Sequence, residues 1–143
     1  SNSVDPLHIA SSLTRLNIQR IRCSKPGGTW RDWPEDLQLR CHRSEKGKSY
    51  VSVYGRMRWD DVSPTITTQF FGYGTGRFGH PEQDRALTLR EGAILQSFPA
   101  DYQFIPPNEV VCIRKIARYI GNAVPPRLGE IIGESIISSL KDS

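Results

Sequence analysis

The sequence is poor in cysteine. Its 143 residues include three, Cys23, Cys41 and Cys112, which are widely separated and odd in number. This pattern argues against a disulfide framework and favours a reducing compartment. The closely paired cysteines of a zinc site are also missing, and Cys41-His42 is the only adjacent pair of possible ligands. We therefore expect no metal site.

Long apolar runs are missing as well. No stretch approaches the roughly 18 apolar residues of a membrane-spanning helix, and no signal-peptide pattern is visible, so we expect no membrane partner. The opening Ser1-Asn2-Ser3 has the composition of an expression-vector scar. We therefore leave residues 1–3 out of the fold argument.

Basic residues outnumber acidic ones, 19 to 15, which gives a formal charge of +4. The excess is concentrated in residues 15–58, where eleven lysines and arginines face four acidic residues. Such a segment permits a polyanionic partner. A solvated basic surface without a partner is the alternative that charge alone leaves open.

Local patterns predict an α+β fold. Asp5-Pro6 is a typical helix start, followed by apolar residues at helical spacing. Residues 50–58 and 65–71 are rich in β-branched and aromatic side chains, which predicts two strands of a small antiparallel sheet. Thr88 to Glu91 has the spacing of a capping box, and further helices are expected from Glu109 and from Pro125-Pro126. The strand–helix alternation of a nucleotide-binding sheet is missing.

The glycine-rich segment 72–79 contains Gly74-Thr-Gly76-Arg-Phe-Gly79, which satisfies the dinucleotide pattern G-x-G-x-x-G. That pattern requires a helix to begin at the third glycine, whereas His80-Pro81 follows here. We interpret the segment as a loop whose backbone approaches a ligand closely.

Residues 54–77 have the chemistry of a DNA-facing surface. Arg56 and Arg58 alternate on one side of the predicted strand, so both guanidinium groups would reach one duplex. Threonine hydroxyls and glycine amides suit phosphate oxygens. A polar strand face with a hairpin loop is the alternative.

Two longer segments resemble a known family. Arg85-x-Leu-Thr-x-Arg-Glu-x-Ala-x-x-Gln-x-Phe-Pro99 is similar to motif IX of the DNA cytosine-5 methyltransferases, and Ile120-Gly-Asn-Ala-Val-Pro125 is similar to motif X. Residues 54–67 and 76–81 resemble the recognition segment before motif IX. The resemblance covers about residues 5–140.

The resemblance implies a division of labour. Residues 4–108 would be a small target-recognition domain that includes motif IX. Residues 109–143 would be the motif X turn and helices on the side of a Rossmann-like catalytic domain, on which the last helix would dock. The parent enzyme would transfer a methyl group from S-adenosylmethionine to C5 of a cytosine flipped out of duplex DNA.

The resemblance also suggests roles for individual residues. The expected DNA contacts are Arg56, Arg58, Thr65, Thr67, Gly72, Gly74, Gly76 and Arg77. The expected border of the cofactor pocket is Asn122, Ala123 and Val124. The expected structural residues of motif IX are Arg85, Thr88, Arg90, Glu91, Gln96 and Pro99. The alternative to a structural role is that Arg90 and Glu91 form a catalytic pair.

The nucleophile of this family is missing. It is a cysteine that follows a proline, whereas Arg22, Arg40 and Val111 precede the three cysteines here. The Phe-x-Gly-x-Gly cofactor loop is missing too. We therefore expect no catalytic residue in this chain and no activity without a large catalytic domain or subunit.

Three further expectations concern setting and partners. An autonomous DNA-binding module without a catalytic partner is the alternative function. The apolar stripe of the last helix, with Leu128, Ile132 and Ile136, predicts self-association when it is uncovered. The family resemblance implies a bacterial cytoplasmic protein associated with the nucleoid.

Overall fold

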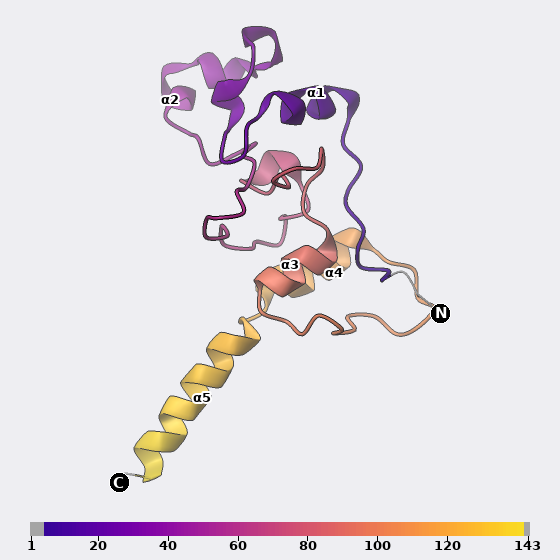
Figure 1. The fold of residues 1–143 in the computed structure, drawn as a ribbon, viewed down its shortest axis with the longest axis vertical. Coiled ribbons are helices and arrows are strands. Elements are labelled where there is room, and N and C mark those ends of the chain that lie inside the picture. Colours follow the sequence, from indigo (N-terminus) through magenta and orange to yellow (C-terminus); the bar gives the residue numbers. More distant parts are fainter. Residues whose placement is uncertain (1–4, 142–143) are drawn as a thin grey trace.

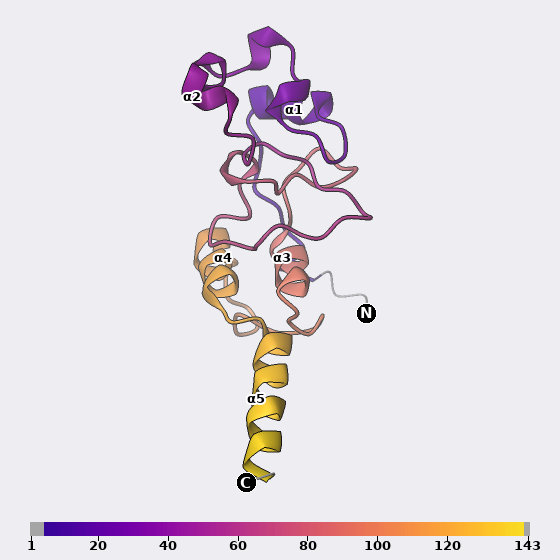
Figure 2. The same ribbon diagram turned by 90° about the vertical axis from the view of Figure 1, so that its left-hand side faces the viewer.

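The computed structural model describes residues 5–141, so the expected scar at residues 1–3 lies outside the described residues. Helices joined by long loops form the fold (Figures 1 and 2). The α-helices are α1 (Arg15–Cys23), α2 (Glu45–Lys48), α3 (Leu89–Leu95), α4 (Ile113–Asn122) and α5 (Pro126–Lys141). Four short 3-10 helices lie between them: η1 (Trp30–Asp32), η2 (Glu35–Leu37), η3 (Arg40–Arg43) and η4 (Tyr73–Thr75).

The predicted antiparallel strands are wrong. Between residues 5 and 141 the structure has no β-strand, and its β pairing consists of two isolated bridges, Arg56 with Gly79 and Gly79 with Ala86. The segment 50–58 is interrupted at Tyr54, whose φ of 54° lies in the left-handed region that an extended strand excludes. The expected α+β class is therefore replaced by helices and irregular loops.

The second predicted strand, 65–71, folds into a turn. The Phe70 amide donates to the Thr67 carbonyl at 3.2 Å, and the Gly72 amide donates to the Gln69 carbonyl at 2.9 Å. Backbone groups that a sheet ladder would pair are thus satisfied locally. Ile66 and Phe70 of this segment are still buried, so its composition reflects core packing and not strand pairing.

The first helix begins later than predicted. α1 starts at Arg15 after Thr14, whose hydroxyl accepts from the Asn17 amide, and not at Asp5-Pro6. The chain before it crosses the start of α3 (Figure 1). The Leu7 carbonyl accepts from the Arg90 amide at 2.9 Å. Amides in the first turn of a helix have no partner within the helix, and this crossing segment supplies one.

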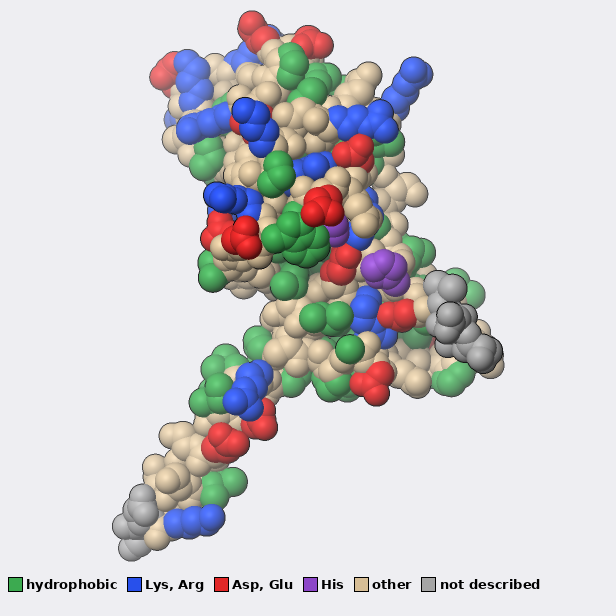
Figure 3. Space-filling view, viewed as in Figure 1, with side chains coloured by type: hydrophobic (Ala, Val, Ile, Leu, Met, Phe, Trp, Pro, Cys, Tyr) green, Lys and Arg blue, Asp and Glu red, His purple; other side chains and the backbone are tan. Residues whose placement is uncertain are grey.

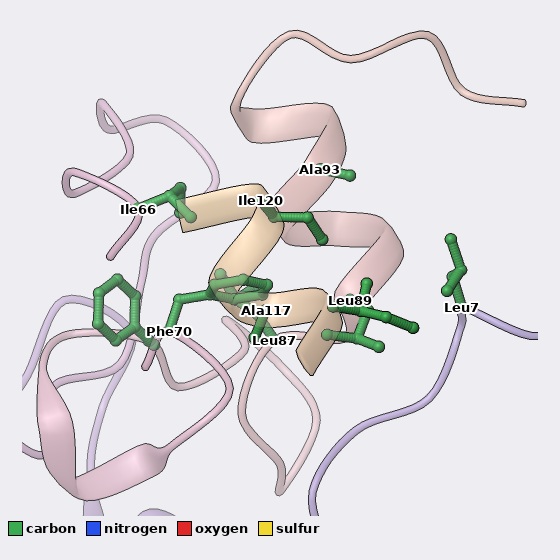
Figure 4. Close-up of a cluster of buried hydrophobic side chains, with 10 residues drawn as sticks. Leu7, Ile66, Phe70, Leu87, Leu89, Ala93, Ala117 and Ile120 are labelled. Carbon is green, nitrogen blue, oxygen red and sulfur yellow. The ribbon is translucent and has the colours of Figure 1, made fainter. Parts of the chain in front are cut away.

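Two clusters of buried apolar side chains organise the molecule. One lies between α3, α4 and the segment 66–89, where Ile66 and Phe70 meet Ala117 and Ile120 of α4 (Figure 4). The other cluster includes Trp30, Trp33 and Tyr73 and packs among the 3-10 helices of the N-terminal half. Trp30 also stacks on the buried His42. The segment 66–89 contributes to both clusters and joins them.

Helix α5 projects away from the rest of the chain (Figures 1 and 2), and the space-filling view shows it clear of the body (Figure 3). It begins at Pro126 as expected, but none of its residues is buried. The Arg127 amide ties its first turn to Ser97 Oγ at 3.1 Å. No helix among residues 5–141 has the length and apolarity needed to cross a membrane.

Candidate nucleic-acid interface

Two exposed arginines lie over glycines. The stem of Arg58 passes over Gly27, where a Cβ atom would overlap the arginine Cδ. Arg77 passes in the same way over Gly55, where a Cβ atom would stand 2.5 Å from its Cγ. Both arginines line a small hollow together with Asp61. The missing side chains of the two glycines therefore let the arginine stems pack directly on the backbone, while the guanidinium groups reach solvent.

Arg56 is placed differently from Arg58, because the strand that would align them is missing. It is 8% exposed, and its Nη2 donates to Asp84 Oδ1 at 2.9 Å and to the Gln83 carbonyl at 3.3 Å. Its Nε is a buried polar atom that has no hydrogen-bond partner among the described residues. Arg56 thus holds the 81–84 loop and also lines the hollow beside Arg58 and Arg77.

Thr65 and Thr67 are exposed, while Ile66 between them is buried in the core. The Thr67–Thr68 peptide lies directly against Gly121 at the end of α4, where a Cβ atom would overlap it. The two hydroxyls are therefore carried on a backbone that is anchored from both sides.

The glycine loop packs mainly on aromatic rings. Gly76 is buried, and a Cβ atom there would overlap the Phe78 ring. Gly74 lies against the Tyr54 ring, and Gly72 lies near Thr75, whose hydroxyl donates to the Gly72 carbonyl at 2.7 Å. Gly72 and Gly74 are partly exposed, so their backbones are accessible, whereas Gly76 serves internal packing.

Motif IX is held by a paired ion bridge. Arg85 Nη1 and Nη2 donate to the two Glu91 oxygens, each at 2.7 Å. Thr88 and Glu91 also form the expected capping box, in which the Thr88 amide donates to Glu91 at 2.8 Å and the Glu91 amide donates to the Thr88 hydroxyl at 3.1 Å. Arg85 thereby fastens the 83–86 loop to the start of α3.

Arg90 has other partners. Its guanidinium binds both oxygens of Asp5, and its Nη1 donates to the Tyr102 carbonyl at 3.0 Å. Arg90 and Glu91 therefore point to separate partners and form no pair with each other. The Gln96 amide nitrogen donates to the Ile120 carbonyl at 3.0 Å, and the Pro99 carbonyl caps a turn to Tyr102.

These contacts change the acidity of three carboxyl groups. Burial opposes ionisation of Glu91, but Arg85 and the Thr88 amide outweigh it and lower the pKa of Glu91 to about 2. The hydrogen bond from Arg90 lowers the pKa of Asp5, and the one from Arg22 lowers the pKa of Asp84. Ionised carboxylates are thus part of the scaffold that supports the exposed arginines.

The motif X turn lies at the junction of α4 and α5. Asn122 and Val124 are exposed there, and Ala123 is half-buried. Gln96 fixes the turn from below, because its amide nitrogen also lies 3.4 Å from the Ala123 carbonyl. The turn thus presents two side chains to solvent, the amide of Asn122 and the apolar side chain of Val124.

Residues 6–138 match the family model described as C-5 cytosine-specific DNA methylase. The chain belongs to this family. The matched range includes the Arg85–Glu91 bridge and Gly121 with the turn after α4.

Curated relatives are much longer than this chain. It is 59% identical over 132 residues to "Type II methylase M.HgiDII" of Herpetosiphon aurantiacus, covering 92% of the chain and 37% of the relative. It is 39% identical over 121 residues to "Type II methyltransferase M.Eco47II" of Escherichia coli, covering 80% of the chain and 27% of the relative. It is 32% identical over 150 residues to "DNA (cytosine-5)-methyltransferase 3" of Arabidopsis thaliana, covering 93% of the chain and 10% of the relative. The chain spans little more than a third of their lengths, or less.

Sequence reasoning missed the residues that position this surface. Gly27, Gly55 and Gly121 matter because another segment lies against each of them, and no local pattern reports such an approach. Gly27 also has a φ of 78°, which its Pro-Gly-Gly setting signals as a turn. Asp84, the partner of Arg22 and Arg56, is separated from both by more than 25 residues.

Proposed function

We propose that this chain is the DNA target-recognition portion of a cytosine-5 DNA methyltransferase of a restriction–modification system. The observation that carries the proposal is the contact between Gly121 and the Thr67–Thr68 peptide. It joins the motif X turn, expected beside the cofactor, to the threonine segment expected at the DNA. A family member needs these two parts in fixed relation, because the target base must meet the methyl donor.

The residues that we propose to contact DNA are those whose side chains or backbone are exposed. Arg58 and Arg77 suit phosphates or the O6/N7 edge of guanine, and the hydroxyls of Thr65 and Thr67 suit phosphates. The accessible backbone at Gly72 and Gly74 extends this surface. Arg56 and Gly76 serve it from below, as positioning residues for the loops that carry the others.

Asn122, Ala123 and Val124 fit the methionine end of S-adenosylmethionine, which supplies the methyl group when bound. An amide can hydrogen-bond the amino-acid group, and an apolar side chain can pack beside the thioether. Asn122 and Val124 are exposed on one turn, so they would form one side of the cofactor pocket. The rest of that pocket must come from a catalytic large domain or subunit. We propose that α5 and this turn form the side on which that partner docks.

The chain alone is proposed to be inactive. A thiolate nucleophile is central to the chemistry of this family, and none of the three cysteines follows a proline. The parent protein would act on chromosomal DNA at the bacterial nucleoid, in the cytoplasm.

A chimera tests the proposal. The segment of the Herpetosiphon protein that aligns with this chain is replaced by this chain, and transfer of labelled methyl groups from S-adenosylmethionine to mixed-sequence duplex DNA is measured. We expect incorporation from the chimera and none from this chain alone. Robust incorporation by the chain alone contradicts the proposed inactivity, whereas an inactive but folded chimera together with sequence-selective DNA binding by the chain favours an autonomous DNA-binding module.

A further inference from the structure

We infer that Arg114 and Arg118 of α4, with the adjoining Thr68–Phe71 turn, form a binding site for a phosphate of the DNA backbone. The inference rests on the proposed DNA-binding role and adds a contact outside the recognition loops. Both arginines lie outside motifs IX and X.

The two arginines stand one helical turn apart and face the threonine segment. Arg114, Arg118 and Gly121 are spaced i, i+4 and i+7, so they form one stripe along α4. Gly121 touches the Thr67–Thr68 peptide, which directs the rest of the stripe along the following turn. A hollow of about 380 Å³ results, lined by Thr68, Gln69, Phe71, Arg114 and Arg118.

The charge in this hollow is not neutralised. Both arginines are exposed, and within residues 5–141 neither has a salt bridge or side-chain hydrogen bond. The residues that line the hollow include no carboxylate, and α4 carries Arg114, Lys115 and Arg118 without an acidic residue. Six of the other twelve arginines have an acidic partner among residues 5–141, whereas no carboxylate of this part of the chain lies against this pair, so an anion from outside would neutralise it.

The donors around the hollow suit a phosphodiester. Arginine forks bind phosphate oxygens in pairs, and threonine hydroxyls and glutamine amides are common phosphate donors. The Phe71 ring at the edge of the hollow offers an apolar surface for a sugar. Thr68, which lines the hollow, directly follows Thr67, one of the residues proposed to meet the strand. A carboxylate of the catalytic domain is the competing ligand, but it would leave the neutral donors and the aromatic edge without a role.

The site is built before the ligand arrives. Gly121 sets the distance between α4 and the turn, and the Gln96 amide holds the end of α4 through the Ile120 carbonyl. Ile116, Ala117 and Ile120 are fully buried and fix the rotation of the helix. The arginine side chains therefore sit on a rigid element, which lowers the ordering cost of a phosphate contact.

Salt-dependent binding of the 143-residue chain to a fluorescent 20-base-pair duplex tests the inference. Three proteins are compared: the unmodified chain, the double variant R114Q/R118Q, and K115Q, which removes a charge from the same helix outside the stripe. Each phosphate contact contributes about −0.9 to the slope of log K against log salt. Because the two arginines share one phosphate, we expect the double variant to reduce the magnitude of that slope by about 0.9 and to bind about tenfold more weakly near 0.1 M salt, with a much smaller change for K115Q.

The outcomes separate the two proposals. If the unmodified chain shows no salt-dependent binding, the proposed function fails, and this inference fails with it. If it binds and R114Q/R118Q matches K115Q in slope and affinity, the DNA-binding role stands and the phosphate site is overturned. Loss of activity in the R114Q/R118Q form of the chimera, with unchanged DNA binding, assigns the arginines to the catalytic domain and also overturns it. An unchanged circular dichroism spectrum and melting temperature establish that the variants are folded.

Discussion

At the scale of single residues, arginines divide into those that cross-link the scaffold and those that reach solvent. Arg56 binds Asp84, Arg85 binds Glu91 and Arg90 binds Asp5, and the three arginines are largely buried. In each pair at least one of the two residues lies in a loop. A chain with few ladder hydrogen bonds thus relies on charged hydrogen bonds to hold its loops.

Substitution of Glu91 by glutamine should destabilise the protein near neutral pH. The pKa of Glu91 falls from 4.5 to about 2 on folding, which corresponds to about 3 kcal/mol of stability. Because the folded-state pKa is the lower one, this contribution is complete above pH 4.5 and is lost as the pH falls toward 2. Urea unfolding of the unmodified chain and E91Q should differ by about 3 kcal/mol at pH 7 and converge near pH 2.

The exposed Glu109 provides the control, and E109Q should leave the free energy of unfolding within about 0.5 kcal/mol of the unmodified chain. A difference between E91Q and the unmodified chain that persists unchanged down to pH 2 would mean that the charge of Glu91 is not its source.

At the scale of elements, glycine sets how closely the helices approach the loops. Gly121 lets α4 touch the Thr67–Thr68 peptide, and Gly92 lets α3 touch the Phe70 ring. Both glycines lie in helices, where glycine costs about 1 kcal/mol relative to alanine. Glycine is nevertheless required at both positions, because any side chain there would overlap the neighbouring segment.

Alanine at Gly121 and alanine at Gly133 should have opposite effects. G121A forces the Thr67–Thr68 backbone away from α4, and we expect a loss of about 2–3 kcal/mol in the free energy of unfolding. G133A meets nothing within 4 Å in α5, so helix propensity alone should act. It should raise the helical signal of α5 in circular dichroism without lowering the melting temperature. Equal stability of G121A and the unmodified chain would contradict the close approach.

None of the side chains of helix α5 is buried against the rest of the described chain. Its apolar side chains, Leu128, Ile131, Ile132, Ile136, Ile137 and Leu140, are all about half exposed or more. Single helices of this length are marginal in water, so covering this surface would stabilise α5. The catalytic side of the parent enzyme is the proposed cover, and another copy of the chain is a substitute when that side is missing.

Self-association of the isolated chain should therefore depend on the apolar surface of α5. We expect the unmodified chain to show a concentration-dependent sedimentation coefficient, and I132Q/I136Q to sediment as a monomer at the same concentrations. Glu134 lies on the polar face, so E134Q is the matched control and should behave as the unmodified chain does. A monomeric unmodified chain at all concentrations would refute the prediction.

At the scale of the whole molecule, one segment links two hydrophobic clusters and also carries the proposed DNA surface. Residues 66–89 contribute Ile66 and Phe70 to one cluster and Tyr73 and Ala86 to the other. Core packing on both sides therefore fixes loops that have no sheet to support them. The arginines proposed to contact DNA are Arg58, Arg77, Arg114 and Arg118, and all four are exposed.

The salt dependence of DNA binding should report this arrangement. If Arg58 and Arg77 each neutralise one phosphate and Arg114 and Arg118 share a third, the slope of log K against log salt should be about −2.7. R58Q/R77Q should reduce the magnitude of that slope by about 1.8, and binding should weaken on cognate and unrelated duplexes alike wherever the arginines contact phosphate. A slope near zero for the unmodified chain would exclude a backbone-contact surface.

The sequence by itself was sufficient for the family, the Thr88–Glu91 cap and the start of α5, because each depends on residues that are close together in the chain. It was misleading for the strands, since β-branched and aromatic residues suit any half-buried surface and the segment 65–71 buries them in a turn. Only the tertiary structure decided that Arg56 is buried, that Gly121 meets the threonine segment, and that Arg114 and Arg118 face the same turn. These features depend on contacts between residues far apart in the chain, and local spacing carries no record of such contacts.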